Sequence, residues 1–235
     1  MQYIGRKMAK LYVVAIDIGN NKDITLRALE VLKQVDYIIC EEFKEARRFL
    51  KKHNIKNKLK NLNEHNEENK TDDLLKEILI NDKAVALISD AGTPLFADPG
   101  NSLVWKCHQN NISVHPVPGP SSIMAALMGS GIIKDKFFYY GFLSANKYER
   151  RKELHKIKYM SDTDMVFLEA PYRLKQLLQS MRKKLGDKRD AIVAYKLTQP
   201  EEKFFWGNLK ELATMTTNLK KGEFVLILRK YKKYR

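Results

Sequence analysis

The feature that most constrains the fold of this chain is a regular alternation of strand-like and helix-like segments. The run LYVVAI (11–16) is continuously apolar and largely β-branched, whereas ITLRALEVLKQV (24–35) carries its apolar residues at helical spacing. The same alternation recurs up to the strand pattern EFVLILR (223–229). Continuous apolar strands are buried on both faces, so helices must cover both sides of their sheet. The sequence therefore predicts an α/β fold.

The connector GSGIIKDK (129–136) interrupts this alternation and predicts two α/β lobes, residues 1–130 and 131–235. We expect Asp23 to cap the first helix, and we expect 57–73 to be a polar, irregular surface excursion. The strand patterns are 11–16, 37–40, 84–89, 112–117, 137–142, 164–170, 190–197 and 223–229. The helix patterns are 24–35, 45–55, 73–81, 103–111, 121–130, 148–160, 172–186 and 208–215.

Composition favours a polyanionic partner, because 43 Lys and Arg residues against 28 Asp and Glu give a formal charge of +15. Nucleic acid is the most plausible such partner. A solvated basic surface without any ligand has nearly equal weight on charge alone.

Several other classes of protein are disfavoured by the sequence. No apolar run approaches the roughly 20 residues that span a bilayer, and the N-terminus MQYIGRKMAK has no apolar signal-peptide core. We therefore expect a cytoplasmic protein without a membrane partner, in which Cys40 and Cys107 are reduced core thiols. The motifs GxxxxGK[ST], GxGxxG and GxSxG are absent, and the five histidines lack metal-ligand spacing, so no metal site is expected.

Three loops rich in small and polar residues follow the ends of apolar strands. They are DIGNN (17–21), SDAGTP (89–94) and PGPSS (118–122). Open parallel sheets bind ligands outside the carboxyl ends of their strands, and glycine lets a ligand approach the backbone closely. One such loop is more often an ordinary turn, but three together predict a shared ligand cleft. We expect Asp98 to cap the helix after Gly100 rather than to contact that ligand.

Ordered blocks along the chain resemble the tetrapyrrole-methylase superfamily of S-adenosylmethionine-dependent methyltransferases. More narrowly, they are similar to the branch that 2′-O-methylates a cytidine ribose in 16S ribosomal RNA. SDAGTP followed by DPG, and PGPSS followed by SG, are the most specific. The blocks are LYVVAIDIGNNKDITLRAL (11–29), NEHNEENK (63–70), VALISDAGTPLFADPG (85–100), VPGPSSIMAALMGSGI (117–132), FFYYGFL (137–143) with YERRKEL (148–154), FLEAPYRL (167–174), KLTQPEE (196–202) with WGNLKEL (206–212), and KGEFVLIL (221–228).

The resemblance implies a fold of two α/β lobes with a cleft between them that binds S-adenosylmethionine. It implies that the substrate is ribosomal RNA or the 30S subunit and that the protein is a homodimer. By the same carry-over, the cofactor-binding residues are Asp90, Gly92, Thr93, Ser121, Ser122, Leu168, Glu169 and Ala170. Candidates for a base that activates the ribose hydroxyl are Glu169, Lys196, Asp17 and Glu42. RNA contacts are expected from the basic residues Lys44, Arg47, Arg48, Arg150 and Arg151.

Three loops depart from the family pattern. Ile16-Asp17 stands where the family usually has Thr-Pro, Glu41-Glu42-Phe43-Lys44 where it has Glu-Asp-Thr-Arg, and Tyr195–Gln199 where it has Arg-Glu-Leu-Thr-Lys. These loops keep two alternatives open. One is a methylase of the same superfamily that acts on a tetrapyrrole or a protein side chain, and the other is a catalytically silent RNA-binding relative.

Overall fold

The computed structural model describes residues 9–132, 136–160 and 162–231. The expected N-terminal segment lies largely outside these residues, as do positions 133–135 of the predicted connector. The chain divides into two compact units, Met1–Ser121 and Ser122–Arg235. In the described part of the chain, no helix is both long and apolar enough to cross a membrane.

The first unit is a parallel sheet covered by helices on both faces, as the continuous apolar strands predict. The strands are β1 (Lys10–Val14), β2 (Tyr37–Cys40), β3 (Leu59–Asn61), β4 (Ala84–Leu87) and β5 (Ser113–Val117). The helices are the 3-10 helix η1 (Asn21–Asp23) and the α-helices α1 (Leu26–Gln34), α2 (Phe43–Lys52), α3 (Glu67–Ile80) and α4 (Asn101–Gln109). The strand order is β3-β2-β4-β1-β5, and every neighbouring pair is parallel.

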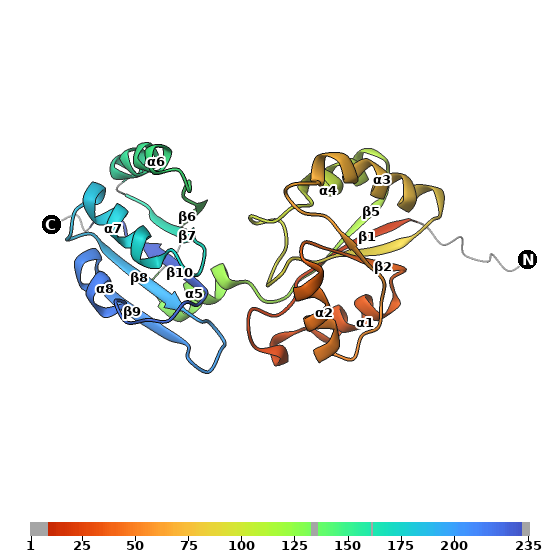
Figure 1. The fold of residues 1–235 in the computed structure, drawn as a ribbon, viewed down its shortest axis with the longest axis horizontal. Coiled ribbons are helices and arrows are strands. Elements are labelled where there is room, and N and C mark those ends of the chain that lie inside the picture. Colours follow the sequence, from red (N-terminus) through yellow and green to blue (C-terminus); the bar gives the residue numbers. More distant parts are fainter. Residues whose placement is uncertain (1–8, 133–135, 161, 232–235) are drawn as a thin grey trace, which may run out of the picture. The chain divides into compact units, whose positions relative to one another are not determined.

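Two apolar clusters hold these three layers together. Residues of α1 and α2 such as Leu32 and Phe49 share one cluster with the strands, whereas α3 and α4 contribute Ile78 and Leu103 to a second cluster. Figure 1 shows α1 and α2 on one side of the first sheet and α3 and α4 on the other. Cys40 and Cys107 are buried free thiols, one in each cluster, as we expected.

The second unit is a mixed sheet with the order β6-β7-β10-β8-β9. Its strands are β6 (Phe137–Phe142), β7 (Asp164–Leu168), β8 (Asp190–Tyr195), β9 (Lys203–Asn208) and β10 (Phe224–Leu228). Its helices are α5 (Ser122–Ser130), α6 (Lys147–Tyr159), α7 (Leu174–Leu185) and α8 (Leu209–Met215). The pair β6 and β7 is parallel, and the other neighbours are antiparallel.

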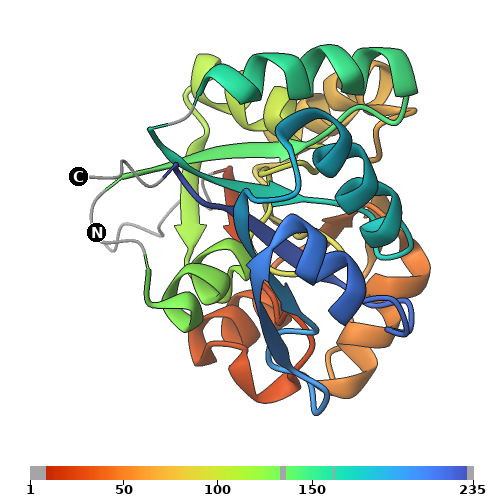
Figure 2. The same cartoon turned by 90° about the vertical axis from the view of Figure 1, so that its left-hand side faces the viewer.

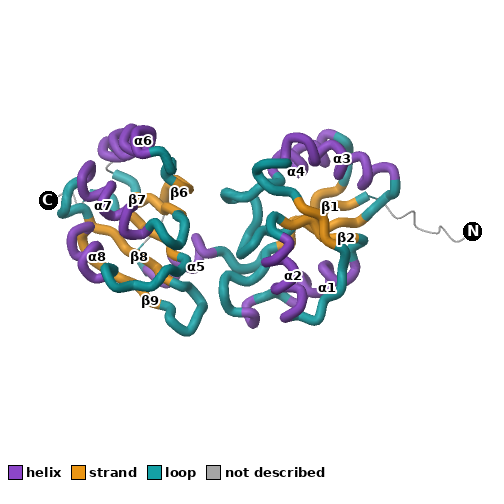
Figure 3. The backbone as a smooth tube through the Cα atoms, in the orientation of Figure 1, coloured by secondary structure: helices purple, strands orange, loops and turns teal. Residues whose placement is uncertain are grey.

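One large apolar cluster joins α6, α7 and α8 to one face of this sheet. Figure 2 shows α7 and α8 lying against the strands of this sheet, and Figure 3 gives the same elements as a tube. Helix α5 packs against β8 and β10. Its Gly129 lies so close to Phe204 of β9 that a Cβ would be 2.3 Å from the ring. Because of these contacts α5 groups with the second unit, although our sequence-based division at 130/131 placed it in the first.

The structure corrects three local predictions. The segment 57–73 contains β3 and the first turns of α3 rather than an irregular excursion. Strand β9 was not predicted at all. The first α-helix begins after Thr25, whose hydroxyl accepts a hydrogen bond from the Ala28 amide, whereas Asp23 ends the preceding 3-10 helix.

Candidate functional site

The candidate site in the first unit lies at one edge of its sheet. All neighbouring strands of this sheet are parallel, so the loops that follow β1, β2, β4 and β5 meet at their common carboxyl edge. The three loops that the sequence singled out are therefore brought together by the topology. Ligands of open α/β sheets bind at this edge because no strand or helix covers it.

The loops after β1 and β4 are joined to each other by two backbone hydrogen bonds. The Ile16 amide donates to the Gly92 carbonyl over 2.9 Å, and the Gly92 amide donates to the Asp17 carbonyl over 3.1 Å. Gly92 has a φ of +75°, a left-handed conformation that favours glycine. The Ile16-Asp17 departure from the family pattern is compatible with this loop pairing, because the pairing uses only backbone atoms.

The loop after β5 is attached to the same structure. The Thr93 hydroxyl donates to the Pro120 carbonyl over 2.9 Å. A Cβ on Gly119 would lie 3.1 Å from that of Ala15, so the β5 loop passes close to the end of β1. Asp90, Gly92 and Thr93 thus lie in one network with the PGPS segment up to Ser121, whereas Ser122 begins α5 in the second unit.

Three carboxylates interact at this edge. One of them, Glu41, is not among the site residues predicted from the sequence. Burial raises the pKa of Glu41 to about 7, with further contributions from Asp90 and Asp98. Burial also raises the pKa of Asp98 to about 6 and raises that of Asp90. The Glu42 amide donates to Asp90 Oδ1 over 3.3 Å, which ties the β2 loop to the β4 loop. The edge therefore gathers three carboxyl groups, whose ionised forms a cationic ligand would favour.

The prediction that Asp98 caps α4 is wrong. The N-cap of α4 is Gly100, which has a φ of +118°. This residue makes no side-chain hydrogen bond that caps the helix. Instead Glu67 of α3 accepts hydrogen bonds from the amides of Gly100 and Ser102, over 2.8 and 3.3 Å. Asp98 therefore does not cap α4 and instead interacts electrostatically with Glu41 and Asp90 at the edge.

In the second unit, the residues predicted to bind the cofactor follow the end of β7. The Glu169 side chain is only 1 % exposed, and its Oε1 lies 3.3 Å from Nη1 of Arg173. The same oxygen accepts a hydrogen bond from the Ala170 amide over 2.9 Å. Its Oε2 is buried and has no hydrogen-bond partner among the described residues. Leu168, the last residue of β7, and Ala170 are both half-buried.

Lys196 lies in a strained loop after β8. It has a φ of +48°, Thr198 has a φ of +63°, and the Thr198 hydroxyl is buried without a hydrogen-bond partner in the described chain. The Lys196 amine lies 3.1 Å from Glu201 Oε1, and this hydrogen-bonded pair raises the pKa of Lys196. A raised pKa keeps the amine protonated at neutral pH, which argues against Lys196 as a proton acceptor and favours a role as a cation.

The predicted RNA-binding residues differ in their exposure. Lys44, Arg47 and Arg48 are exposed on α2, where Arg48 pairs with Glu45 over 3.7 Å. Arg151 is exposed on α6. Arg150, however, is only 3 % exposed, and its Nη1 donates to the carbonyls of Ser144 and Ala145. Arg150 therefore holds the loop before α6, and this reduces the expected contribution of its charge to RNA binding.

Among residues 9–132, 136–160 and 162–231, no group of three or more His, Cys, Asp or Glu side chains is arranged to hold a metal ion.

A parallel α/β unit with a carboxylate-lined loop edge, followed by a mixed α/β unit, defines a class of two-unit α/β proteins. The family model of tetrapyrrole (corrin/porphyrin) methylases matches residues 10–213. The chain belongs to this family, which makes it a methyltransferase.

Relatives named ribosomal RNA small subunit methyltransferase I are similar over most of the chain. The one from Vibrio cholerae is 40 % identical over 94 % of this chain and 77 % of its own length. The one from Bacillus subtilis is 37 % identical over 97 % of this chain and 78 % of its own length. Among solved structures, a diphthine synthase has a TM-score of 0.70 at 14 % identity, covering 94 % of this chain and 89 % of that one, which supports the fold.

Proposed function

We propose that this protein transfers the methyl group of S-adenosylmethionine to the 2′-hydroxyl of a cytidine ribose in 16S ribosomal RNA. Two named relatives at 37–40 % identity support the ribosomal substrate. The observation that carries the proposal is the carboxyl edge of the first sheet, where Gly92 joins two loops and the carboxyl groups of Glu41, Asp90 and Asp98 interact.

The charge of the site fits this cofactor. S-adenosylmethionine carries a sulfonium and an ammonium against a single carboxylate, so its net charge is positive. Asp90, Gly92 and Thr93 would hold it, together with Ser121, Ser122 and the strand end Leu168–Ala170, as the family resemblance implies. A bound cation would favour the ionised forms of the nearby carboxylates and lower their pKa.

The reaction is an in-line displacement at the methyl carbon. Bound S-adenosylmethionine would supply an activated methyl group: the ribose oxygen would bond to its carbon as the carbon–sulfur bond breaks with the electron pair going to sulfur, and a base would accept the hydroxyl proton. Alignment supplies much of the rate, because the donor is already activated. Burial raises the pKa of Glu41 to about 7, and a bound cation would favour its ionised, proton-accepting form, so Glu41 is a candidate for this base. Glu169 stays an alternative, whereas Lys196 is better suited to bind phosphate.

The decisive experiment incubates the protein and S-adenosylmethionine labelled in the methyl group with 30S subunits, free 16S rRNA and a uroporphyrinogen. We expect label in RNA, recovered as 2′-O-methylcytidine after nuclease digestion. Label in the tetrapyrrole, or in a ribosomal protein, would replace this proposal with another superfamily activity. Cofactor binding without label in any acceptor would indicate a catalytically silent relative.

We further propose that the protein acts in the cytoplasm, where small subunits are assembled, and that it is a homodimer. Sedimentation equilibrium tests the second statement directly. A single species with the 27.4 kDa mass of one chain would contradict it.

A further inference from the structure

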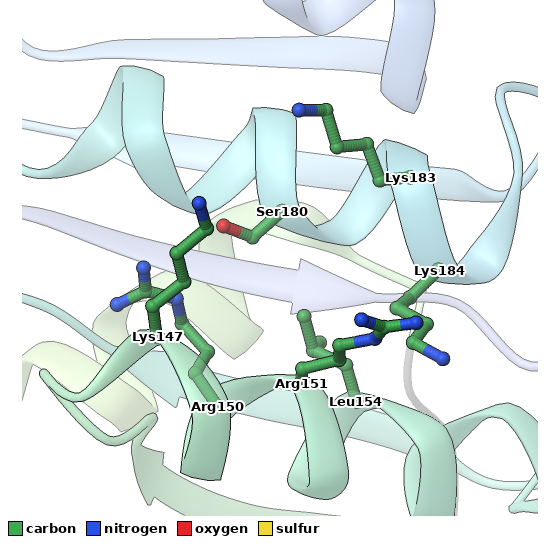
Figure 4. Close-up of a pocket in the computed structure, with 7 residues that line it drawn as sticks. All are labelled: Lys147, Arg150, Arg151, Leu154, Ser180, Lys183 and Lys184. Atoms are coloured by element: carbon green, nitrogen blue, oxygen red, sulfur yellow. The ribbon is translucent and has the colours of Figure 1, made fainter.

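A second candidate site lies in the second unit, in a pocket between α6 and α7 with a volume of about 340 Å³. The two helices pack against each other through Leu154, Leu178 and other members of the apolar cluster. At Ser180 the α7 side chain is short, and the helices leave open space above Leu154. Figure 4 shows the side chains of Lys147 and Arg151 reaching from α6 toward α7.

The lining of this pocket is almost entirely basic. Five of its seven residues carry a positive charge and none is acidic; they are Lys147, Arg150 and Arg151 of α6, and Lys183 and Lys184 of α7, beside Leu154 and Ser180. Arg150 forms part of the wall, because it is buried and bonded to two carbonyls. The other four supply the charge that a ligand would meet.

No ion pair within the described residues neutralises this charge. Within the described residues, the four cations make no ion pair, because the acidic residues nearest to them in sequence have other partners. Glu149 pairs with Lys152 over 3.0 Å, Glu153 accepts from the Ser144 amide over 2.9 Å, and Asp187 pairs with Arg182 over 2.8 Å. Lys147 and Arg151 are moreover one turn apart on α6, where like charges repel. The pocket is thus prepared for an anion from outside the protein.

We propose that the α6–α7 pocket binds the phosphodiester backbone of the RNA substrate, an inference that rests on the proposed function. Arginine offers a planar pair of donors that matches phosphate, and lysine adds a mobile point charge. Further exposed lysines, Lys156 and Lys158 on α6 and Lys175 on α7, add positive charge to the same two helices, which favours a polymer over a single small anion. Contacts to phosphate oxygens position the RNA strand without selecting its sequence.

The test compares the double variant Arg151→Gln/Lys183→Gln with the control Lys33→Gln/Lys76→Gln. All four side chains are exposed, and both variants lose two charges. The probe is a fluorescent single-stranded RNA of 16S sequence, titrated at several salt concentrations. We expect the pocket variant to bind at least about tenfold more weakly, with a salt slope reduced by about 0.7 to 0.9 for each lost phosphate contact. Equal affinity and slope for the two variants would overturn the proposal.

Two further measurements separate this proposal from others. In competition, cytidine monophosphate at matched phosphate concentration should not displace the RNA; full displacement would identify a small-anion site instead. Methyl transfer to 30S subunits should show a raised KM with little change in kcat for the pocket variant. If the wild type transfers no methyl group but its RNA affinity still falls in the pocket variant, the proposed function fails and the pocket stands. If the wild type methylates 30S subunits and both variants match it, the pocket fails and the function stands.

Discussion

Gly92 and Ile18 approach so closely that a Cβ built on Gly92 would lie 2.9 Å from Cγ2 of Ile18. Gly92 also has a φ of +75°, which L side chains rarely adopt. Gly92→Ala should therefore lower the free energy of unfolding by about 1–3 kcal/mol. Because Gly92 joins the β1 and β4 loops, cofactor affinity should fall as well. Chemical denaturation and calorimetric titration with S-adenosylmethionine measure the two effects.

Gly131→Ala is the matched control for this change. Gly131 has a φ of +60°, but no atom of the described residues lies within 4 Å of a Cβ built there. The Gly131→Ala variant therefore measures the cost of backbone strain without a contact such as the one with Ile18. Adding Ile18→Ala to Gly92→Ala should recover part of the stability, since it removes Cγ2 of Ile18, the atom that the new Cβ would meet. If Gly92→Ala were no more destabilising than Gly131→Ala, the close packing of these loops would have no energetic consequence.

Asp90 is the carboxylate that we expect to matter most for the cofactor. Asp90→Ala should weaken S-adenosylmethionine binding about tenfold, which corresponds to about 1.4 kcal/mol, because a nearby negative charge stabilises the sulfonium or ammonium group. Isothermal titration calorimetry gives this affinity directly. Asp72→Ala is a suitable control, since Asp72 is an exposed carboxylate whose partner is Lys106. An unchanged affinity in folded Asp90→Ala protein would place the cofactor elsewhere.

Glu41 gives the stability a predictable dependence on pH. Its pKa is about 7 in the folded protein against an ordinary value of 4.5. The folded state therefore holds the proton of Glu41 more tightly than the unfolded state does. Protonation of Glu41 stabilises the folded state fully below about pH 4.5, and this stabilisation is lost as the pH rises through 7. Glu41→Gln keeps the side chain neutral, so it should raise the free energy of unfolding by about 1–3 kcal/mol at pH 8. At pH 4 the variant and the wild type should unfold alike.

Denaturant unfolding at both pH values tests this expectation. Glu68→Gln serves as control, because Glu68 is an exposed glutamate of α3 outside the carboxylate cluster. A gain for Glu41→Gln that is equal at pH 4 and pH 8 would mean that its ionisation is not the cause. If Glu41 also accepts the proton of the ribose hydroxyl, the same variant should lower kcat and remove a limb of the pH–rate profile near 7.

The buried parallel strands and the loops at their ends could be predicted from the sequence for a physical reason. A strand covered on both faces must be apolar along its whole length, so β2 and β4 stand out in the sequence. The short edge strand β3 has only half-buried residues, and in β9 only Phe205 is buried, so neither shows the continuous apolar run of a buried strand. Their pairing depends on neighbours distant in the chain, which a local pattern cannot reveal.

The candidate site shows the same difference between local features, which could be predicted from the sequence, and long-range contacts, which could not. Glycine and small residues at strand ends identified the loop around Gly92, because their effect on the backbone is local. The protonation of Glu41 was not predictable, since it depends first on burial in the folded chain and then on Asp90 and Asp98, about 50 residues away or more. Helical periodicity likewise could not tell that Arg150 is buried while Arg151 is exposed. The role assigned to Asp98 failed because the residue that caps α4 belongs to another helix.

That cap supplies the last prediction. Glu67 accepts hydrogen bonds from the Gly100 and Ser102 amides at the start of α4, so one carboxylate fixes both the helix and the end of the loop that carries Asp90. Glu67→Ala should lower the free energy of unfolding by about 1–2 kcal/mol, and Glu67→Gln, which keeps an acceptor oxygen, by less. Glu68→Ala removes an exposed acidic residue from the same first turn of α3 and should change the stability little. Thermal and denaturant unfolding rank the three variants, and equal effects of Glu67→Ala and Glu68→Ala would show that the contact between α3 and α4 does not cap the helix.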